Sequence, residues 1–111
     1  MLATPETLAA CYDLLKTTKP LCRWKLPDSD EIEFHVLLRP DRYGEFLAPN
    51  IIRVSARLAT RLDTILQTVA HEMIHLRQHQ TKTAGKGQHN AEWYRLAYAV
   101  CKQHGWELAR F

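Results

Sequence analysis

A long stretch of helical periodicity in the middle of the chain constrains the fold most. Apolar residues recur there every three or four positions, at Leu58, Leu62, Ile65, Leu66, Val69, Met73 and Ile74. This spacing predicts one helix with an apolar face, for which Ser55 or Thr60 is a candidate N-cap. The polar, glycine-containing segment 81–87 should end it. We therefore expect a long core helix that the remaining elements cover.

A second helix and a strand precede this core helix. Thr4 and Pro5 are typical of a helix start, and the helix that follows should end before Pro20. From residue 31 the period changes to two, which predicts a half-buried strand. The apolar face of this strand carries Ile32, Phe34, Val36 and Leu38.

Two shorter apolar runs, 45–48 and 51–54, predict further strands after a turn at 39–44. The connections look too short for crossovers, so we expect a small antiparallel sheet. A last helix should begin near His89 or Asn90 and close at Gly105. The pattern predicts an α+β fold, with the long helix packed on the sheet and flanked by N- and C-terminal helices.

The length and composition fit one globular domain over residues 1–111. Of the 111 residues, 46% are apolar and 24% are charged, which is typical of a folded globule. No stretch approaches the roughly 20 apolar residues of a membrane span, and the N-terminus lacks the pattern of a secretory signal. We expect a cytoplasmic, intracellular protein. Cys11, Cys22 and Cys101 suit inert thiols better than a disulfide framework.

The long helix carries the motif His71-Glu72-Met73-Ile74-His75. Residues four apart on a helix lie roughly 40° from each other and one turn apart, so His71 and His75 can direct imidazole nitrogens at one ion. Glu72 leans toward the same point and could accept a proton from water there. This HExxH arrangement predicts zinc as the metal and Glu72 as the catalytic base of a zinc metalloprotease.

A catalytic zinc ion usually has three protein ligands and one open position. His79 would need the same straight helix to supply ligands along roughly 12 Å, which one ion cannot span. Glu92 resembles the glutamate ligand of other peptidases. His89 fits better, because the loop before it can reverse the chain and the next helix provides a rigid mount. The residue pattern favours His71, His75 and His89, with Glu92 as the alternative.

The two histidine segments resemble the SprT-like domain of the Spartan metalloprotease family. In this sequence they are 71–75 and Gly87-Gln88-His89-Asn90-Ala91-Glu92-Trp93. The resemblance implies a zincin-like fold, His89 as the third zinc ligand, and proteolysis of proteins on or crosslinked to DNA. The chain ends at Phe111 without the C-terminal cysteine zinc ribbon that bacterial members typically carry, which weakens the implied link to DNA.

The sequence thus predicts a zinc-dependent endopeptidase that hydrolyses peptide bonds with metal-activated water. Its partners would be a protein or peptide substrate, with single-stranded DNA as a further candidate and no membrane; the oligomeric state is not predicted. Two alternatives remain: a non-catalytic zinc-stabilised module that binds DNA or protein, and a glutamate-ligand peptidase that cleaves regulators. The substrate would add a strand to the edge at 45–48 or 51–54.

Two sets of residues are open to further roles. Tyr43, Tyr94 and Arg77 are candidates for stabilising the transition state by residue type alone. Basic residues that could form a DNA surface are Lys16, Lys19, Arg23 and Lys25 with Trp24, and Arg77, Lys82 and Lys86. An aromatic side chain in a basic groove is typical of single-strand binding. We expect His35 and His104 to be surface or structural residues.

Overall fold

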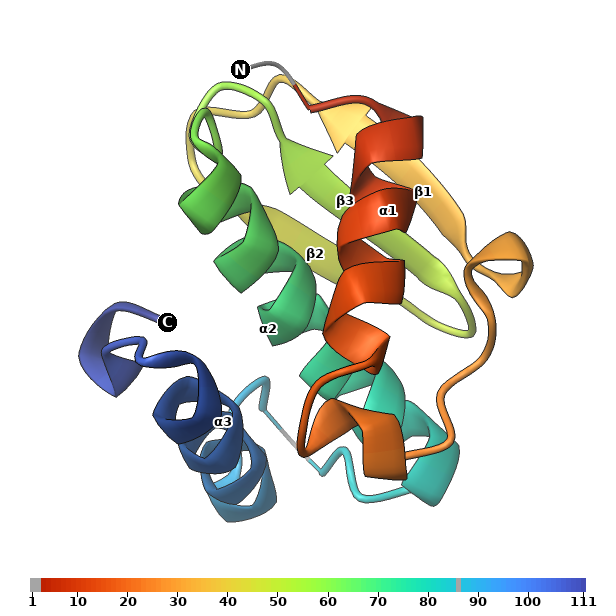
Figure 1. The fold of residues 1–111 in the computed structure, drawn as a ribbon, viewed down its shortest axis with the longest axis vertical. Coiled ribbons are helices and arrows are strands. Elements are labelled where there is room, and N and C mark those ends of the chain that lie inside the picture. Colours follow the sequence, from red (N-terminus) through yellow and green to blue (C-terminus); the bar gives the residue numbers. More distant parts are fainter. Residues whose placement is uncertain (1–2, 86) are drawn as a thin grey trace.

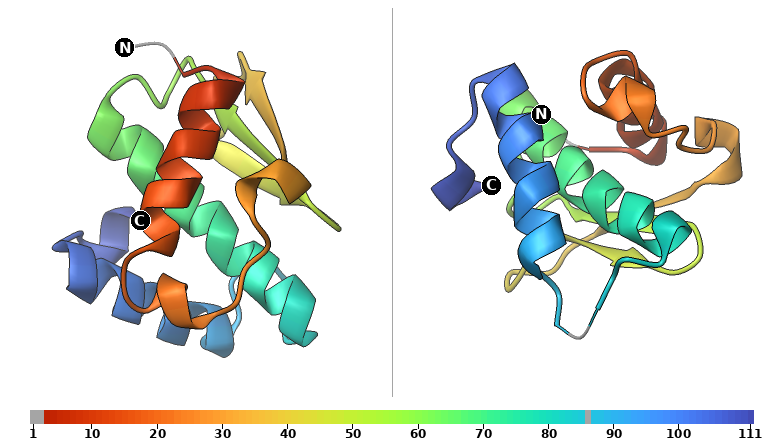
Figure 2. Two further views of the ribbon diagram at one scale, coloured as in Figure 1. Left: turned by 45° about the vertical axis from the view of Figure 1, so that its right-hand side comes forward. Right: turned by 90° about the horizontal axis from the view of Figure 1, so that it is seen from below.

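The computed structural model describes residues 3–85 and 87–111 and has an α+β architecture. Its elements are α1 (Pro5–Lys16), η1 (Leu21–Arg23), η2 (Ser29–Glu31), β1 (Glu33–Leu37), β2 (Gly44–Leu47), β3 (Ile51–Ser55), α2 (Leu62–Thr81), α3 (Ala91–His104) and η3 (Leu108–Arg110). Helices α1 and α2 pack on each other and cover one face of the sheet (Figure 1). Helix α3 packs on α2, and η3 returns against α3 (Figure 2).

The sheet has three strands in the order β1-β3-β2 and is mixed. β2 pairs with β3 in antiparallel fashion, but β1 pairs with β3 in parallel. The prediction of an antiparallel sheet was therefore wrong for β1. The chain leaves β1, crosses to the far edge as β2 and returns as the central strand. Residues 38–50, which include β2, supply the dozen or so residues that a parallel return needs.

The inner face of the sheet is apolar and meets the helices. Phe34, Ile52 and Phe46 lie side by side across the three strands, and all three belong to or pack against the core. The predicted alternation over 32–36 is confirmed. Leu38 is an exception, because it lies beyond the end of β1 and its side chain is 71% exposed.

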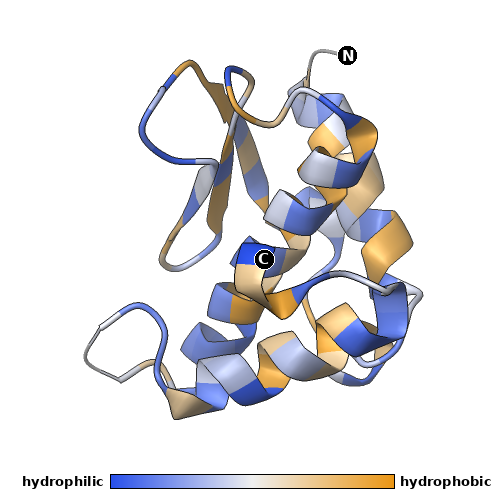
Figure 3. Cartoon of the chain, turned by 90° about the vertical axis from the view of Figure 1, so that its left-hand side faces the viewer, coloured by the Kyte–Doolittle hydropathy of each residue, from blue (hydrophilic) through white to orange (hydrophobic). Residues whose placement is uncertain are grey.

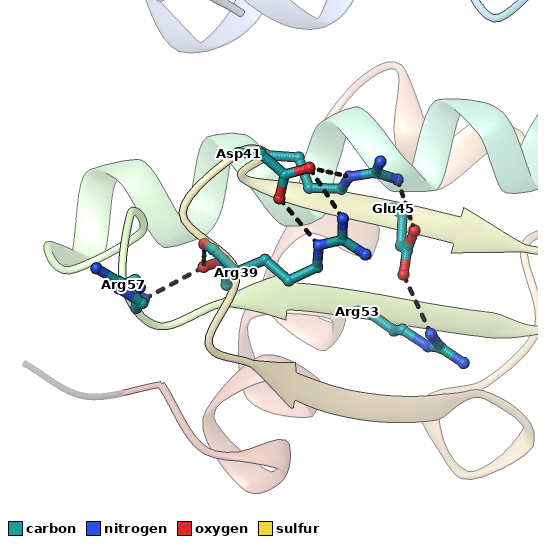
Figure 4. A network of polar contacts seen from close by, with 7 residues as sticks. Arg39, Asp41, Glu45, Arg53 and Arg57 are labelled. Carbon is teal, nitrogen blue, oxygen red and sulfur yellow. Dashed lines mark hydrogen bonds and ion pairs between the residues drawn. The ribbon is translucent and has the colours of Figure 1, made fainter.

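The outer face of the sheet and the turn beside it carry a network of ion pairs. Glu45 on β2 binds Arg42 at 3.0 Å and Arg53 of β3 at 3.1 Å. Asp41 in turn binds Arg39 at 2.9 Å (Figure 4). The network ties β2 to its neighbour from the solvent side. Because the pairs are partly exposed, each contributes little stability alone.

The helix ends are set by local hydrogen bonds, with one departure from the predictions. Thr4 caps α1 by accepting a hydrogen bond from the Thr7 amide at 3.1 Å. α2 begins at Leu62, one residue after its N-cap Arg61, so neither predicted cap is used. The Ser55 hydroxyl instead donates to the Arg39 carbonyl at 2.5 Å, at the end of β3. The sequence suggested Ser55 as a cap by residue type, whereas its hydroxyl forms a hydrogen bond at the end of the sheet instead.

One apolar cluster joins the two layers. Ile52, Ile65, Val69, Met73 and Ile74 are fully buried in it. Among the described residues, no helix combines the length and the apolar character that crossing a bilayer requires. The buried residues of α2 in the cluster show that its apolar face serves the core, as its periodicity predicted.

Truncating the central strand should weaken the whole fold. Ile52→Ala removes a fully buried side chain, and we expect it to lower the free energy of unfolding by about 2–5 kcal/mol. Chemical denaturation monitored by circular dichroism measures this loss. Leu14→Ala is the control, because Leu14 is 57% exposed on α1 and its truncation should cost no more than about 0.5 kcal/mol. Equal losses in the two variants would contradict the proposed core.

Candidate metal centre

Helix α2 presents two imidazoles side by side. His71 and His75 lie one turn apart and are both half-buried, and their ring centroids are 5.3 Å apart. The helix is regular through this region, so the spacing follows directly from its pitch. Two of the predicted metal ligands thus come from one rigid element.

His89, at the turn before α3, completes a cluster of three imidazoles. Its Nε2 atom lies 3.2 Å from Nε2 of His71, and its ring centroid lies 5.3 Å from that of His75. One nitrogen of each histidine falls within 4.8 Å of the other two. Imidazoles that share a tetrahedral zinc ion at 2.0–2.1 Å have nitrogens about 3.3 Å apart. The three side chains therefore fit such an ion with small adjustments.

A network of side-chain amides fixes the turn that carries His89. The Gln78 side chain, 1% exposed, donates to Oδ1 of Asn90 at 2.9 Å. The Asn90 amide nitrogen donates to the Thr83 carbonyl at 2.9 Å. Oδ1 of Asn90 also accepts from the Trp93 amide, which caps α3. One asparagine thus joins the end of α2, the loop and the start of α3, directly beside His89.

The surroundings of the histidines favour their neutral forms. Burial lowers the pKa of His71 to about 3, assisted by the charges of His75 and His89 and opposed by a backbone hydrogen bond with Phe111. Burial and then His89 lower the pKa of His75 to about 4. Burial also lowers the pKa of His89. Near neutral pH the imidazoles therefore keep the lone pairs that metal binding requires.

Glu72 lies beside these histidines and is almost fully buried. Its side chain is 4% exposed, and burial, followed by the nearby charge of Glu45, raises its pKa to about 8. A carboxyl group in this range can both accept and return a proton near neutral pH.

Gly44 of β2 makes room for Glu72. A Cβ atom on Gly44 would lie 2.8 Å from the Arg53 carbonyl and from Cγ2 of Thr68, and 3.3 Å from Oε2 of Glu72. Only glycine therefore allows β2 to pass this close to α2. The absent side chain lets the strand border the candidate metal centre.

A mostly polar cavity of about 490 Å³ opens beside Glu72. It is lined by Tyr43, Gly44, Thr64, Gln67, Thr68, His71, Glu72, Arg110 and Phe111. The volume lies in the range of small-molecule and peptide sites, about 300–1,000 Å³. The buried carboxylate and one imidazole thus face a space that a substrate can enter.

The other residues singled out by the sequence lie elsewhere. His79 is exposed and lies next to Phe46, with ring centroids 6.0 Å apart, outside the histidine cluster. Glu92 forms an ion pair with Arg95 at 2.5 Å. Arg77 donates to the Trp24 carbonyl at 2.7 Å. His104 makes a structural contact with Thr18 at 3.0 Å, as expected.

The candidates for transition-state stabilisation separate in the same way. Tyr43 lines the cavity that contains Glu72. Tyr94 instead faces a second hollow beside His89, and Arg77 is held by the loop around Trp24. Tyr43 is therefore the candidate that shares a cavity with the predicted base.

Trp24 does not contribute an aromatic ring to the predicted basic surface. Trp24 is 6% exposed and belongs to the core, so it cannot stack on a nucleic-acid base. Lys16 is paired with Asp28 at 3.1 Å, and Lys86 lies outside the described residues. The structure thus excludes Trp24 from a stacking platform, because the apolar ring contributes more by completing a small core.

Sequence patterns did not assign roles to Gln78, Asn90 and Gly44. A glutamine on the buried side of a core helix is a usable signal, since a buried amide requires hydrogen-bond partners. Asn90 was visible as a candidate start of the last helix, but its link to Gln78 depends on the path of the loop. Gly44 appeared only as part of a turn.

The SprT-like family model matches residues 5–110, nearly the whole chain. This chain belongs to the SprT-like family. Neither the comparison with curated proteins nor that with solved structures returned a match. Membership in the SprT-like family indicates a metallopeptidase-like domain, and the three clustered histidines are a group that could hold its metal ion.

Loosening the turn should weaken metal binding without removing a ligand. We expect Asn90→Ala to lower zinc affinity about 10-fold or more, because outer-shell contacts that orient ligands have effects of this size. Competition with a chromophoric chelator measures the affinity. Gln103→Ala, an exposed change on the same helix, should leave it unaltered. Wild-type zinc affinity in folded Asn90→Ala would show that the amide network does not position His89.

Proposed function

We propose that this chain is a zinc-dependent endopeptidase in which His71, His75 and His89 hold the zinc ion and Glu72 is the general base. The observation that carries this proposal is the convergence of three imidazoles beside a buried carboxylate, next to a cavity. A purely structural metal site has no use for a proton acceptor in this position. The proposal therefore includes catalysis as well as metal binding.

The ligand set suits zinc and leaves it reactive. Three neutral imidazoles and one open position are typical of catalytic zinc sites, whereas structural sites usually have four protein ligands. When bound, zinc supplies a Lewis acid that polarises the substrate carbonyl and acidifies water. The imidazoles have lowered pKa values, which supports metal binding at neutral pH.

Glu72 would act as the general base and then as the general acid of the reaction. It would accept a proton from the attacking water as the new C–O bond forms, and deliver that proton to the departing amine as the C–N bond breaks. Its side chain is almost fully buried, and the cavity that it lines gives the attacking water access. Tyr43 lines the same cavity and is our candidate for hydrogen bonding to the oxygen of the scissile carbonyl.

The edge of the sheet offers a place for the substrate backbone. β3 is the central strand, so of the two candidate edges only β2 remains. No other strand in the described ranges pairs with the outer edge of β2, and its first residue Gly44 lines the cavity. An extended peptide that pairs with β2 would run past Glu72. This arrangement supports a zincin-like mode of substrate binding.

The experiment compares metal content and casein cleavage in wild type and four variants, which are Glu72→Gln, His89→Ala, Glu92→Gln and His79→Ala. We expect one zinc ion per chain and cleavage in wild type. Glu72→Gln should retain zinc and lose at least about 100-fold in turnover. His89→Ala should lose zinc affinity and activity together. His79→Ala is the matched control, since His79 lies one turn beyond His75 on the same helix but outside the cluster.

The outcomes separate the proposal from its alternatives. Zinc binding without cleavage in wild type would favour a non-catalytic zinc module. Full zinc affinity in His89→Ala, with loss in Glu92→Gln, would favour the glutamate-ligand alternative. A parallel set of reactions with single-stranded DNA tests the DNA association that the family likeness implies. Turnover that survives in Glu72→Gln would contradict the proposed mechanism.

A further inference from the structure

A second hollow lies on the α3 side of the candidate metal centre. Its volume is about 520 Å³, and the described residues that line it are His89, Trp93, Tyr94, Leu108, Ala109 and Phe111. The first cavity, by contrast, contains hydroxyl, amide, carboxyl and guanidinium groups. None of the described residues lining the second hollow is an aspartate, glutamate, lysine or arginine. The candidate metal centre therefore lies between a polar cavity and an apolar hollow.

Trp93 lies at the inner side of this hollow. Its ring stacks on His89 with centroids 4.0 Å apart and meets Tyr94 edge to face at 5.3 Å. Trp93 is 2% exposed, and its buried Nε1 finds no hydrogen-bond partner among the described residues. The indole is therefore held by packing and supports the His89 ring that faces the hollow.

Tyr94 and Leu108 form the more open sides of the hollow. Tyr94 is 50% exposed and Leu108 is 36% exposed, although both side chains are large and largely apolar. Exposed apolar surface that gathers around a concavity is typical of a binding site. Burial of an apolar side chain between them would remove this surface from water.

The hollow and the proposed catalytic cavity lie on either side of a shared residue. Phe111 lines both spaces, and its ring lies 5.5 Å from His71 and 6.0 Å from Trp93. In Figure 3 the end of the chain lies between the sheet and α3, over the middle of the molecule. A peptide in the first cavity therefore has the second hollow within reach of a neighbouring side chain.

We propose that this hollow is a substrate subsite that selects a large apolar side chain, preferentially an aromatic one, close to the scissile bond. This inference rests on the proposed function. The aromatic lining favours an aromatic side chain, because rings make offset or edge-to-face contacts. A charged side chain is disfavoured, because the lining residues offer it no ionic partner. His89 links the subsite to the metal centre.

The test uses matched peptides that differ at one side chain, which is phenylalanine, alanine or aspartate. For zinc-loaded wild type we expect kcat/KM to be at least about 10-fold higher for the phenylalanine peptide than for the alanine peptide. Tyr94→Ala and Leu108→Ala should reduce this ratio several-fold. Tyr98→Ala is the control, because Tyr98 lies one turn further along α3, is 58% exposed and does not line the hollow. It should keep the wild-type ratio.

A binding measurement that needs no turnover accompanies the kinetics. Zinc-loaded Glu72→Gln, labelled with ¹⁵N, is titrated with each peptide, and the indole N–H signal of Trp93 is followed by NMR. We expect the signal to shift with the phenylalanine peptide and to shift much less with the alanine or aspartate peptide. The indole signal of Trp24, which is buried in the core and lines neither cavity, serves as the internal reference.

Failure of the subsite and failure of the proposed function give different results. Zinc-dependent cleavage with equal rates for the three peptides, or equal ratios in Tyr94→Ala and Tyr98→Ala, would overturn the subsite and leave the endopeptidase intact. If zinc-loaded wild type cleaved neither casein nor any peptide, the proposed function would fail. The Trp93 signal would then show whether the hollow binds an apolar side chain. A selective shift supports such a binding site, and the absence of a shift overturns the subsite.

Discussion

The candidate site depends above all on the turn that brings His89 back to α2. A straight helix can direct two histidines at one point, but the third ligand must arrive from outside it. In this chain the turn is held by the side-chain amides of Gln78 and Asn90, and the same Asn90 starts α3. The geometry of the cluster is therefore decided by hydrogen bonds that lie beside it.

The second constraint is that α2 must be a core helix and also carry polar groups. Thr68 satisfies its hydroxyl within the helix by donating to the Thr64 carbonyl at 2.8 Å, and Gln78 is satisfied by the turn. Glu72 remains buried beside a cavity, at the point where Gly44 lets β2 approach. The packing thus leaves one carboxyl group with a raised pKa next to the imidazoles, which is typical of functional sites.

The parts of the molecule that were predictable from sequence are those that local patterns control. The helical period marked α1, α2 and α3, and the position of His71 and His75 on one helix fixed their mutual geometry. The strands were found as one alternating run and two shorter runs, but their order was not, because the choice between a parallel and an antiparallel neighbour depends on how 38–50 packs against α2. Trp24 was misjudged for a similar reason, since burial is decided by the surrounding core.

Anomalous X-ray diffraction at the zinc absorption edge, on crystals of the zinc-loaded full chain, tests the central claim most directly. The account predicts one strong peak within about 2.0–2.1 Å of a nitrogen atom of His71, His75 and His89, with Glu72 nearby but outside bonding distance. A peak coordinated by Glu92 in place of His89, or one found only at the exposed group of Asp28, Asp30 and Glu31, would contradict it.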